Sequence, residues 1–338
     1  MARSSPITHL ASRPTGQNEM GSNEATSKPR PRILLTGADG QLGWELRRCF
    51  ATLGEVTCTV GPVPSTPVVP AERLDLSDHG AIRRMLAEVK PDIILNAAAY
   101  TAVDRAEDEV DLATAINGVA PGVLAREAAR LDAWLVHYST DYVFDGTLGR
   151  PYTPSDRPCP ANAYGATKLQ GEEAMRAIPG RHFILRTSWL YGPRGNNFLL
   201  TMLKLMKDGR LLTVVDDQYG APTWARNVAE VTAQIFAQGR AMGEAWFADR
   251  SGTYHVTAGG RCSWYEFACR IAESHLGRPY EPGLNPIPSS EYPTKAKRPP
   301  DSVLDCSDLM NTFGLALEDW SEALKRVMEE LAAGRATG

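Results

Sequence analysis

The most informative residues in the chain are a phenol and an amine four positions apart, Tyr164 and Lys168 in the run NAYGATK. On a helix this spacing puts both side chains on one face. A phenol with a pKa of about 10 is a weak acid at neutral pH, and a nearby ammonium group favours its phenolate form. Tyr164 is therefore a candidate proton donor to a carbonyl oxygen, with Lys168 as the cation that tunes it.

The spacing alone is weak evidence, because many solvated helix faces carry a tyrosine and a lysine four positions apart. It gains weight from Thr140, which ends an apolar strand at the edge where open α/β sheets bind their ligands. The Thr140 hydroxyl can donate to a substrate oxygen beside Tyr164. His137, inside the same apolar strand, is interpreted as a histidine of the core.

A glycine-rich turn, GADGQLG, follows the first apolar strand and opens a helix. This context is typical of a dinucleotide-binding fingerprint, in which glycines permit a tight turn and the helix N-terminus receives the pyrophosphate. The expected cofactor contacts in the turn are Gly37, Asp39, Gly40, Gln41, Leu42 and Gly43.

The second strand ends in TCTVGP, without the carboxylate that binds the ribose diol of NADH and repels a 2′-phosphate. NADPH is therefore expected as cofactor, with NADH also accepted. Asp75 and Leu76 are candidates for the adenine end, although Asp75 can equally serve as a helix-entry carboxylate. Ala97, Ala98 and Ala99 are small enough for close approach of a cofactor, and core packing explains them as well.

Strand-like runs alternate with amphipathic segments, a pattern typical of a Rossmann-type, doubly wound parallel sheet in an α/β fold. Strands are expected at 32–36, 56–60, 92–96, 134–139 and 183–187, with helices near 41–53, 78–89, 110–131, 161–177 and 320–332. Loops are expected at 216–223 and 282–300. We predict a disordered tail at 1–31, an NAD(P)-binding domain at 32–187 to which later segments return, and a mainly substrate-binding domain at 188–335.

The composition is that of an ordinary globular protein, with 338 residues, 43% hydrophobic residues and a net charge of -4. This balance disfavours nucleic acid and membrane surfaces as partners. The six cysteines lack the spacing of a zinc site or a disulfide framework, which favours a reduced, cytoplasmic protein. No apolar run approaches the roughly 20 residues that span a bilayer. Met20 is an alternative start within the polar tail.

Seven segments together resemble the extended short-chain dehydrogenase/reductases, and within them the dTDP-4-dehydrorhamnose reductase subfamily. STDYVF and DQYGAPT are specific to the subfamily, whereas the glycine pattern and Tyr-x-x-x-Lys are shared across the superfamily. The segments are TGADGQLGWEL (36–46), NAAAYTAVDRAE (96–107), HYSTDYVFDG (137–146), NAYGATK (162–168), RTSWLYGPRGNNF (186–198), DDQYGAPTWA (216–225) and YPTKAKRP (292–299).

The resemblance implies NAD(P)H-dependent reduction of the 4-keto group of dTDP-4-dehydro-6-deoxy-L-mannose to dTDP-L-rhamnose. Thr140, Tyr164 and Lys168 match the catalytic triad of the family. Tyr164 would protonate the C4 alkoxide, Lys168 would lower the pKa of that tyrosine and hold the nicotinamide ribose, and Thr140 would orient the carbonyl. The resemblance also implies a sugar site, for which the candidates are Val103, Asp104, Tyr142 and Trp189, with Asn197, Gln218 and Arg298 as weaker ones.

The chain departs from the family at one position that matters for metal binding. Some members bind magnesium at a dimer interface through glutamates, and Arg226 stands where one of these glutamates would be, although Glu45 keeps another. A cation at this position repels a metal ion. No metal is therefore expected, and the chain is predicted to be a monomer or a weak homodimer.

Three alternatives to the reductase differ from it in what they require of these residues. A nucleotide-sugar dehydratase needs a second carboxylate beside the first, but Tyr142 follows Asp141. A non-catalytic partner such as the regulatory subunit of methionine adenosyltransferase does not need Thr140, Tyr164 and Lys168, which this chain retains. Reduction of another nucleotide-linked keto-sugar remains open.

Overall fold

A seven-stranded parallel sheet forms the centre of the molecule, in the order β11-β6-β5-β4-β1-β2-β3. The computed structural model describes Met1 and residues 30–63, 70–281 and 283–336, so nearly all of the predicted 1–31 tail lies outside the described residues. The strands are β1 (Arg32–Thr36), β2 (Glu55–Val60), β3 (Glu72–Arg73), β4 (Ile93–Asn96), β5 (Trp134–Thr140), β6 (His182–Thr187) and β11 (Gly252–His255).

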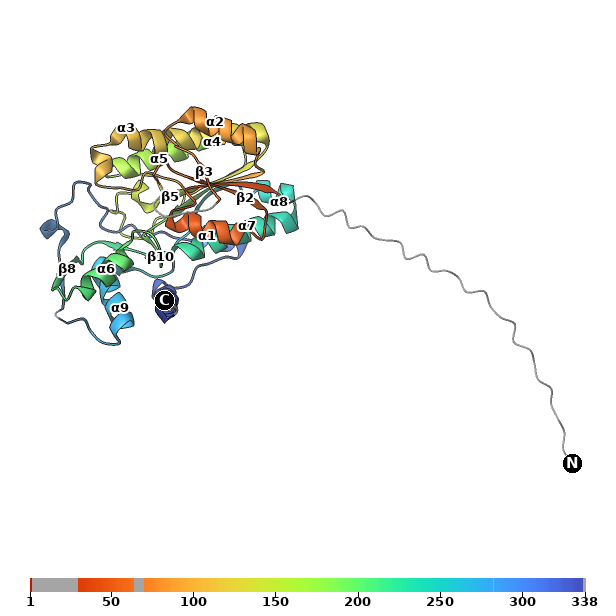
Figure 1. Cartoon of the computed structure of the whole chain (residues 1–338). Helices are drawn as coiled ribbons and strands as arrows, with labels where there is room; N and C mark the ends of the chain where they lie inside the picture. Colours follow the sequence, from red (N-terminus) through yellow and green to blue (C-terminus); the bar gives the residue numbers. More distant parts are fainter. Residues whose placement is uncertain (2–29, 64–69, 282, 337–338) are drawn as a thin grey trace.

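Helices cover both faces of this sheet (Figure 1). On one face lie α2 (His79–Val89), α4 (Ala120–Leu131) and α5 (Ala163–Arg176), and on the other lie α1 (Gln41–Phe50) and α7 (Ala225–Met242). Because both faces are covered, the central strands are buried on both sides: all four residues of β4 and all seven residues of β5 are buried. The predicted doubly wound α/β fold is confirmed.

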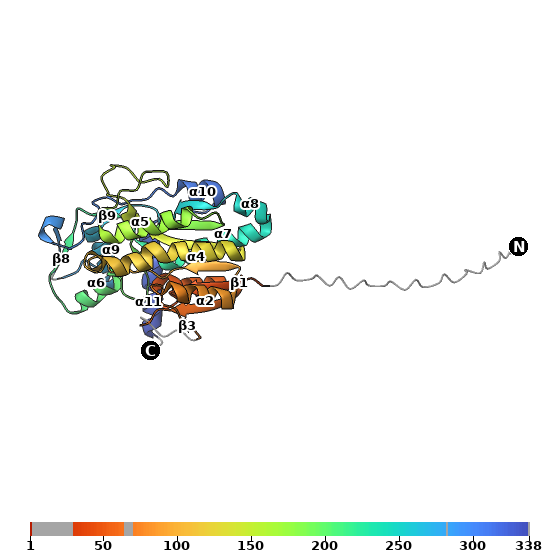
Figure 2. The same cartoon turned by 90° about the horizontal axis from the view of Figure 1, so that it is seen from above.

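A second, smaller group of elements packs beside the carboxyl edge of the sheet (Figure 2). It has its own apolar core around Leu203, Phe267 and Leu324. It comprises α6 (Phe198–Lys207), β8 (Leu212–Val215), α9 (Trp264–Leu276), β13 (Leu284–Ile287) and α11 (Trp320–Ala336). In contrast, α7 and β11 pack with the central sheet although they come from the same half of the chain. The division into two domains at residue 187 stays a prediction.

Two segments that we predicted as loops contain regular structure. Within 216–223 lies β9 (Tyr219–Gly220), which pairs with β12 (Cys262–Ser263), and within 282–300 lies β13, which pairs with β8. Each of these two segments forms a strand because it pairs with another strand far away in the chain. The local sequence does not reveal such a partner.

The helix predicted at 110–131 is also interrupted, because α3 (Val110–Ala113) and α4 are joined by a π-helical turn at Thr114–Val119. This turn carries Asn117, whose amide accepts from the Tyr100 N–H at 2.9 Å and donates to the Tyr100 carbonyl at 3.0 Å. A Cβ on Gly171 of α5 would lie 2.1 Å from the Asn117 carbonyl oxygen. The turn therefore fits tightly against α5 and fixes the segment that follows β4.

In the part of the chain that the structure describes, none of the helices is both long and apolar enough to cross a bilayer. All six cysteines are free thiols.

Candidate active site

The carboxyl ends of β1, β4, β5 and β6 border a cavity of about 600 Å³. It lies where the strand order reverses on either side of β1, the usual ligand position in open α/β sheets. Among the predicted site residues, those that line it are Gly37, Asp39, Gly40, Gln41, Leu42, Ala97, Ala98, Ala99, Thr140, Tyr164, Lys168 and Trp189.

The glycine-rich turn has the shape that a phosphate site needs. Gly37 has a φ of 66°, and a Cβ at this position would lie 2.8 Å from the Ala98 Cα. Helix α1 starts after Gly40 with neither a side-chain cap nor an acidic residue in its first turn. The first N–H groups of α1 are thus available beside the cavity, where they and the helix dipole favour an anion. These features fit the pyrophosphate of a dinucleotide.

Lys168 is 1% exposed and reaches across to β5. Its ammonium donates to the Tyr138 carbonyl at 2.6 Å and lies 3.1 Å from His137 Nε2. Burial lowers the pKa of Lys168 to about 8, although nearby Glu172 raises it. His137 is buried as expected, but it also contacts the candidate catalytic lysine and, through Nδ1 at 2.9 Å, the Asn96 amide.

Tyr164 lies one helical turn before Lys168 and lines the same cavity. Burial raises the pKa of Tyr164 to about 12, while a hydrogen bond with Thr140 lowers it and the Asp141 charge raises it. The Lys168 ammonium is hydrogen-bonded to β5, and its expected effect on the pKa of Tyr164 stays a prediction. Tyr164 is therefore a fully protonated phenol at neutral pH.

Trp189 forms one wall of the cavity in an unusual backbone conformation, with a φ of 44°. Its ring stacks on Trp264, with 3.4 Å between ring centroids and an interplanar angle of 3°. A Cβ on Gly220 would lie 2.5 Å from the indole. The glycine and the stack together hold Trp189 in a conformation that non-glycine residues rarely adopt.

Three other candidates for the sugar site do not line the cavity. Tyr142 packs edge-to-face on Tyr164, with ring centroids 5.8 Å apart. Arg298 Nη2 donates to Asp104 Oδ2 at 3.1 Å, and the Ala296 N–H donates to the other carboxylate oxygen. These contacts join the segment after β4 to the segment 292–300.

Several predicted site residues have other positions or partners. Asn197 caps α6, and its amide nitrogen donates to Gln41, Gly192 and Arg194. Its amide nitrogen therefore binds other parts of the protein in this structure. Asp75 accepts from the backbone and hydroxyl of Ser77 in a turn before α2, so it closes a turn instead of facing the cavity. The residues that do not line the cavity are Gly43, which packs on the Gly37 carbonyl, and Asp75, Leu76, Val103, Asp104, Tyr142, Asn197, Gln218 and Arg298.

The cavity also has lining residues that we did not predict. Thr187 ends β6 next to Thr140 and Ser188 follows it, and the rule that ligands bind at carboxyl strand ends would have found both. Asp141 follows Thr140 and is 2% exposed, and no local pattern in the chain predicts that this carboxylate is buried. The other unpredicted lining residues are Gly61, Val63, Thr101, Tyr138, Ser139, Leu190, Gly195 and Asn196.

Arg226, the position that departs from the family, forms ion pairs with two carboxylates. It lies 3.1 Å from Glu45 of α1 and 2.7 Å from Glu330 of α11. The guanidinium thus joins α1, α7 and α11 at a place where two carboxylates converge. Within the described ranges, no group of three or more His, Cys, Asp or Glu side chains is arranged to hold a metal ion.

Comparison with known proteins gives the same family from sequence and from structure. The family model described as RmlD substrate binding domain matches residues 31–333. The dTDP-4-dehydrorhamnose reductase of Burkholderia thailandensis is 44% identical over 308 residues, covering 89% of this chain and 99% of that protein. The reductase of Escherichia coli K12 is 41% identical over 302 residues, covering 88% and 97%.

Two crystal structures of dTDP-4-dehydrorhamnose reductases have the same fold. The Clostridium acetobutylicum protein superposes with a TM-score of 0.78 at 38% identity, covering 89% of this chain and 99% of that one. The Bacillus anthracis protein, solved in complex with NADP, superposes with a TM-score of 0.76 at 32% identity, with the same coverage. The resemblance drawn from the sequence is therefore confirmed, and the chain belongs to the dTDP-4-dehydrorhamnose reductase family.

Proposed function

We propose that this chain reduces the 4-keto group of dTDP-4-dehydro-6-deoxy-L-mannose to give dTDP-L-rhamnose, with NADPH as cofactor. The observation that carries the proposal is that Thr140, Tyr164 and Lys168 line one cavity together with the glycine-rich turn. We also propose that the protein is cytoplasmic and that it is a monomer or a weak homodimer. Its partner would be the keto-sugar nucleotide that it reduces.

The residues at the carboxyl edge would hold NADPH, with the α1 N-terminus for the pyrophosphate and Lys168 for the nicotinamide ribose. When bound, NADPH supplies the hydride for the sugar carbonyl carbon. The small side chains of Ala97, Ala98 and Ala99 would leave room for the cofactor. The residues that would surround the sugar are Asp104, Tyr142, Trp189 and Arg298.

Tyr164 then acts as the acid. Its O–H bond breaks as a new O–H bond forms on the sugar C4 oxygen, which leaves a phenolate on the enzyme. With a pKa of about 12 the phenol is fully protonated before the reaction. The nearby Lys168 cation stabilises the phenolate that results.

The test of this proposal is turnover of the enzymatically generated keto-sugar, followed by NADPH oxidation and identification of the product. Stoichiometric formation of dTDP-L-rhamnose is expected. A non-catalytic binding partner would give no oxidation, and a reductase of another sugar would turn over a different nucleotide-linked ketone faster.

Arg73 is expected to favour NADPH over NADH. It is aligned with Val60 at the end of β2, and its guanidinium donates to the Gly61 and Pro62 carbonyls at 2.9 and 2.7 Å. A cation therefore stands where NADH-selective enzymes have a carboxylate. Replacing Arg73 by alanine should lower kcat/KM for NADPH about tenfold, the value of one charge-assisted hydrogen bond, and leave NADH within twofold. Equal losses with both cofactors would mean that Arg73 only stabilises the loop.

Gly220→Ala is expected to raise KM for the keto-sugar about tenfold, because the new methyl group would displace Trp189 from the cavity wall. The Kd for NADPH should not change. Gly252→Ala is the matched control, since a Cβ there has its nearest neighbour at 3.9 Å. An unchanged KM in Gly220→Ala would remove Trp189 from the sugar site.

Activity is expected to survive excess EDTA, because the Arg226 guanidinium occupies the place between Glu45 and Glu330 where a metal ion would have to bind. The mass in solution should also be the same with and without magnesium. Loss of activity on chelation, with recovery on adding magnesium, would contradict this account of Arg226.

A further inference from the structure

Asp141 is a buried carboxylate at the end of β5 with both of its oxygens occupied. Oδ1 accepts the Thr140 hydroxyl at 3.0 Å, and Oδ2 accepts the Ser302 hydroxyl at 2.5 Å. Among the described residues no lysine, arginine or histidine pairs with it. Burial raises the pKa of Asp141 to about 6 although both hydrogen bonds lower it. A buried charge without a cation destabilises a fold, so stability does not explain this residue.

The Thr140 hydroxyl has one proton and two possible recipients. It donates to Asp141 at 3.0 Å, while its oxygen accepts the Tyr142 N–H at 3.1 Å. Its hydrogen bond with Tyr164 is the one that lowers the pKa of that phenol. One proton cannot serve Asp141 and the Tyr164 oxygen at once. The charge and orientation of Asp141 therefore decide where the Thr140 proton points, and an ionised Asp141 holds it in one direction.

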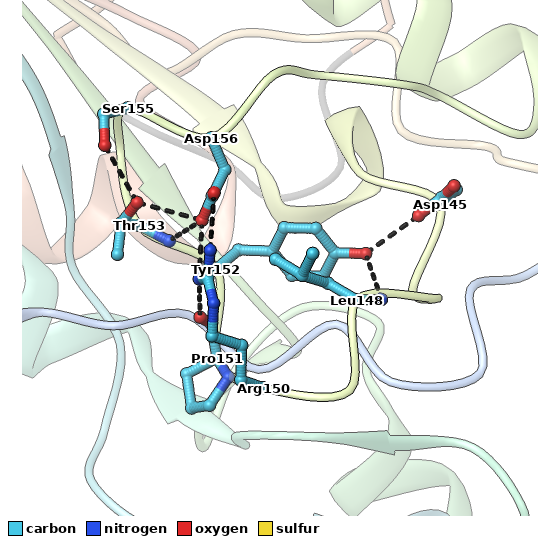
Figure 3. Close-up of polar contacts among 8 residues, drawn as sticks. All are labelled: Asp145, Leu148, Arg150, Pro151, Tyr152, Thr153, Ser155 and Asp156. Atoms are coloured by element: carbon cyan, nitrogen blue, oxygen red, sulfur yellow. Dashed lines mark hydrogen bonds and ion pairs between the residues drawn. The ribbon is translucent and has the colours of Figure 1, made fainter.

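Ser302 is itself held firmly from two sides. Its N–H donates to the Tyr219 carbonyl at 3.0 Å, and the adjacent Val303 carbonyl accepts the Tyr152 N–H at 2.9 Å. Tyr152 belongs to a loop closed by its own polar contacts (Figure 3): the phenol donates to Asp145 at 2.8 Å, and Arg150 pairs with Asp156 at 2.8 Å. Ser302 therefore reaches Asp141 from a rigid support and does not swing freely.

We propose that Asp141 is a positioning residue for the reduction: its carboxylate fixes the direction of the Thr140 hydroxyl, and Ser302 fixes the carboxylate. The inference rests on the proposed function, since it concerns the acid step at Tyr164. The ionised form is the competent one, because only a carboxylate accepts from both hydroxyls. The titratable groups that interact with Asp141 are Tyr142 and Tyr164, and the pKa of each is raised by burial and by the Asp141 charge. Neither phenol titrates near pH 6.

The test compares the pH profiles of kcat/KM and the Tm values of the full-length wild type, Asp141→Asn and Ser302→Ala. In the wild type, kcat/KM should fall as the pH is lowered through about 6, where Asp141 gains its proton. Asp141→Asn should lose kcat about tenfold or more at pH 7.5 and lack this acid limb, with the Kd for NADPH within twofold. Its Tm at pH 7.5 should be unchanged or higher, because the amide removes a buried charge.

Ser302→Ala should move the acid limb to higher pH, because the Ser302 hydrogen bond lowers the pKa of Asp141. Ser263→Ala is the matched control: this hydroxyl also donates to a carboxylate at 2.5 Å, that of Asp216, neither residue lines the cavity, and the loss of this hydroxyl should not move the limb. An acid limb that survives in Asp141→Asn, or a pH-independent loss with a lower Tm, would overturn the proposal while leaving the reductase function intact. Absence of turnover in the wild type would overturn both.

Discussion

Replacing Tyr164 by phenylalanine is expected to lower kcat at least 100-fold, within the range of general acid catalysis. The substitution removes only the hydroxyl and keeps the ring that packs against Tyr142. The Kd for NADPH should therefore stay within about twofold, and the loss should fall on kcat, since the missing contact acts in the transition state. Steady-state kinetics and a fluorescence titration with NADPH measure the two effects.

Tyr191→Phe is a matched control for this variant. Tyr191 is 1% exposed, and its hydroxyl has no hydrogen-bond partner in the described structure, so the same chemical change should leave kcat unaltered. Turnover near that of the wild type in Tyr164→Phe would remove this tyrosine from the mechanism.

Lys168→Met is expected to reduce kcat/KM by at least 100-fold and, unlike Tyr164→Phe, to weaken NADPH binding. The lysine is 1% exposed and its ammonium is the cation beside the candidate acid. Methionine has a similar length and no charge, so packing is largely kept. An unchanged Kd for NADPH would contradict the role of Lys168 in holding the nicotinamide ribose.

The same lysine predicts how activity depends on pH. Burial lowers its pKa from 10.5 to about 8, so about nine-tenths of the molecules carry the charge at pH 7 and about one-tenth at pH 9. Because the charged form is the competent one, kcat/KM should fall as the pH rises through about 8. A profile that stays flat to pH 10 would show that the charge of Lys168 is not needed.

Much of the fold could be predicted because its signals are local. Apolar runs that alternate with amphipathic segments mark β1, β2, β4, β5 and β6, and a glycine turn directly after the first strand marks the phosphate-binding end. Thr140, Tyr164 and Lys168 could be predicted for the same reason, because each lies at a strand end or on a helix that the local pattern predicts. The structure places all three at one cavity.

The features that escaped prediction depend on contacts between distant parts of the chain. Ser302 reaches Asp141 across 161 positions, and β13 forms a strand only because β8 lies beside it. The π-helical turn at 114–119 lies where Gly171 of α5 comes very close to its backbone. The apolar periodicity of residues 110–131 does not reveal this contact. The Lys168 ammonium points toward β5 because a buried ammonium needs hydrogen-bond acceptors, and the Tyr138 carbonyl is one.

We propose that this chain reduces the sugar C4 carbonyl and that Tyr164 supplies the proton. The most direct measurement uses NADPH deuterated at the transferred position, the enzymatically generated keto-sugar, and NMR of the product. We expect dTDP-L-rhamnose with one deuterium at C4 for each NADPH oxidised, formed at least 100-fold more slowly by Tyr164→Phe. Product without deuterium at C4, or no product from the wild type, would contradict it.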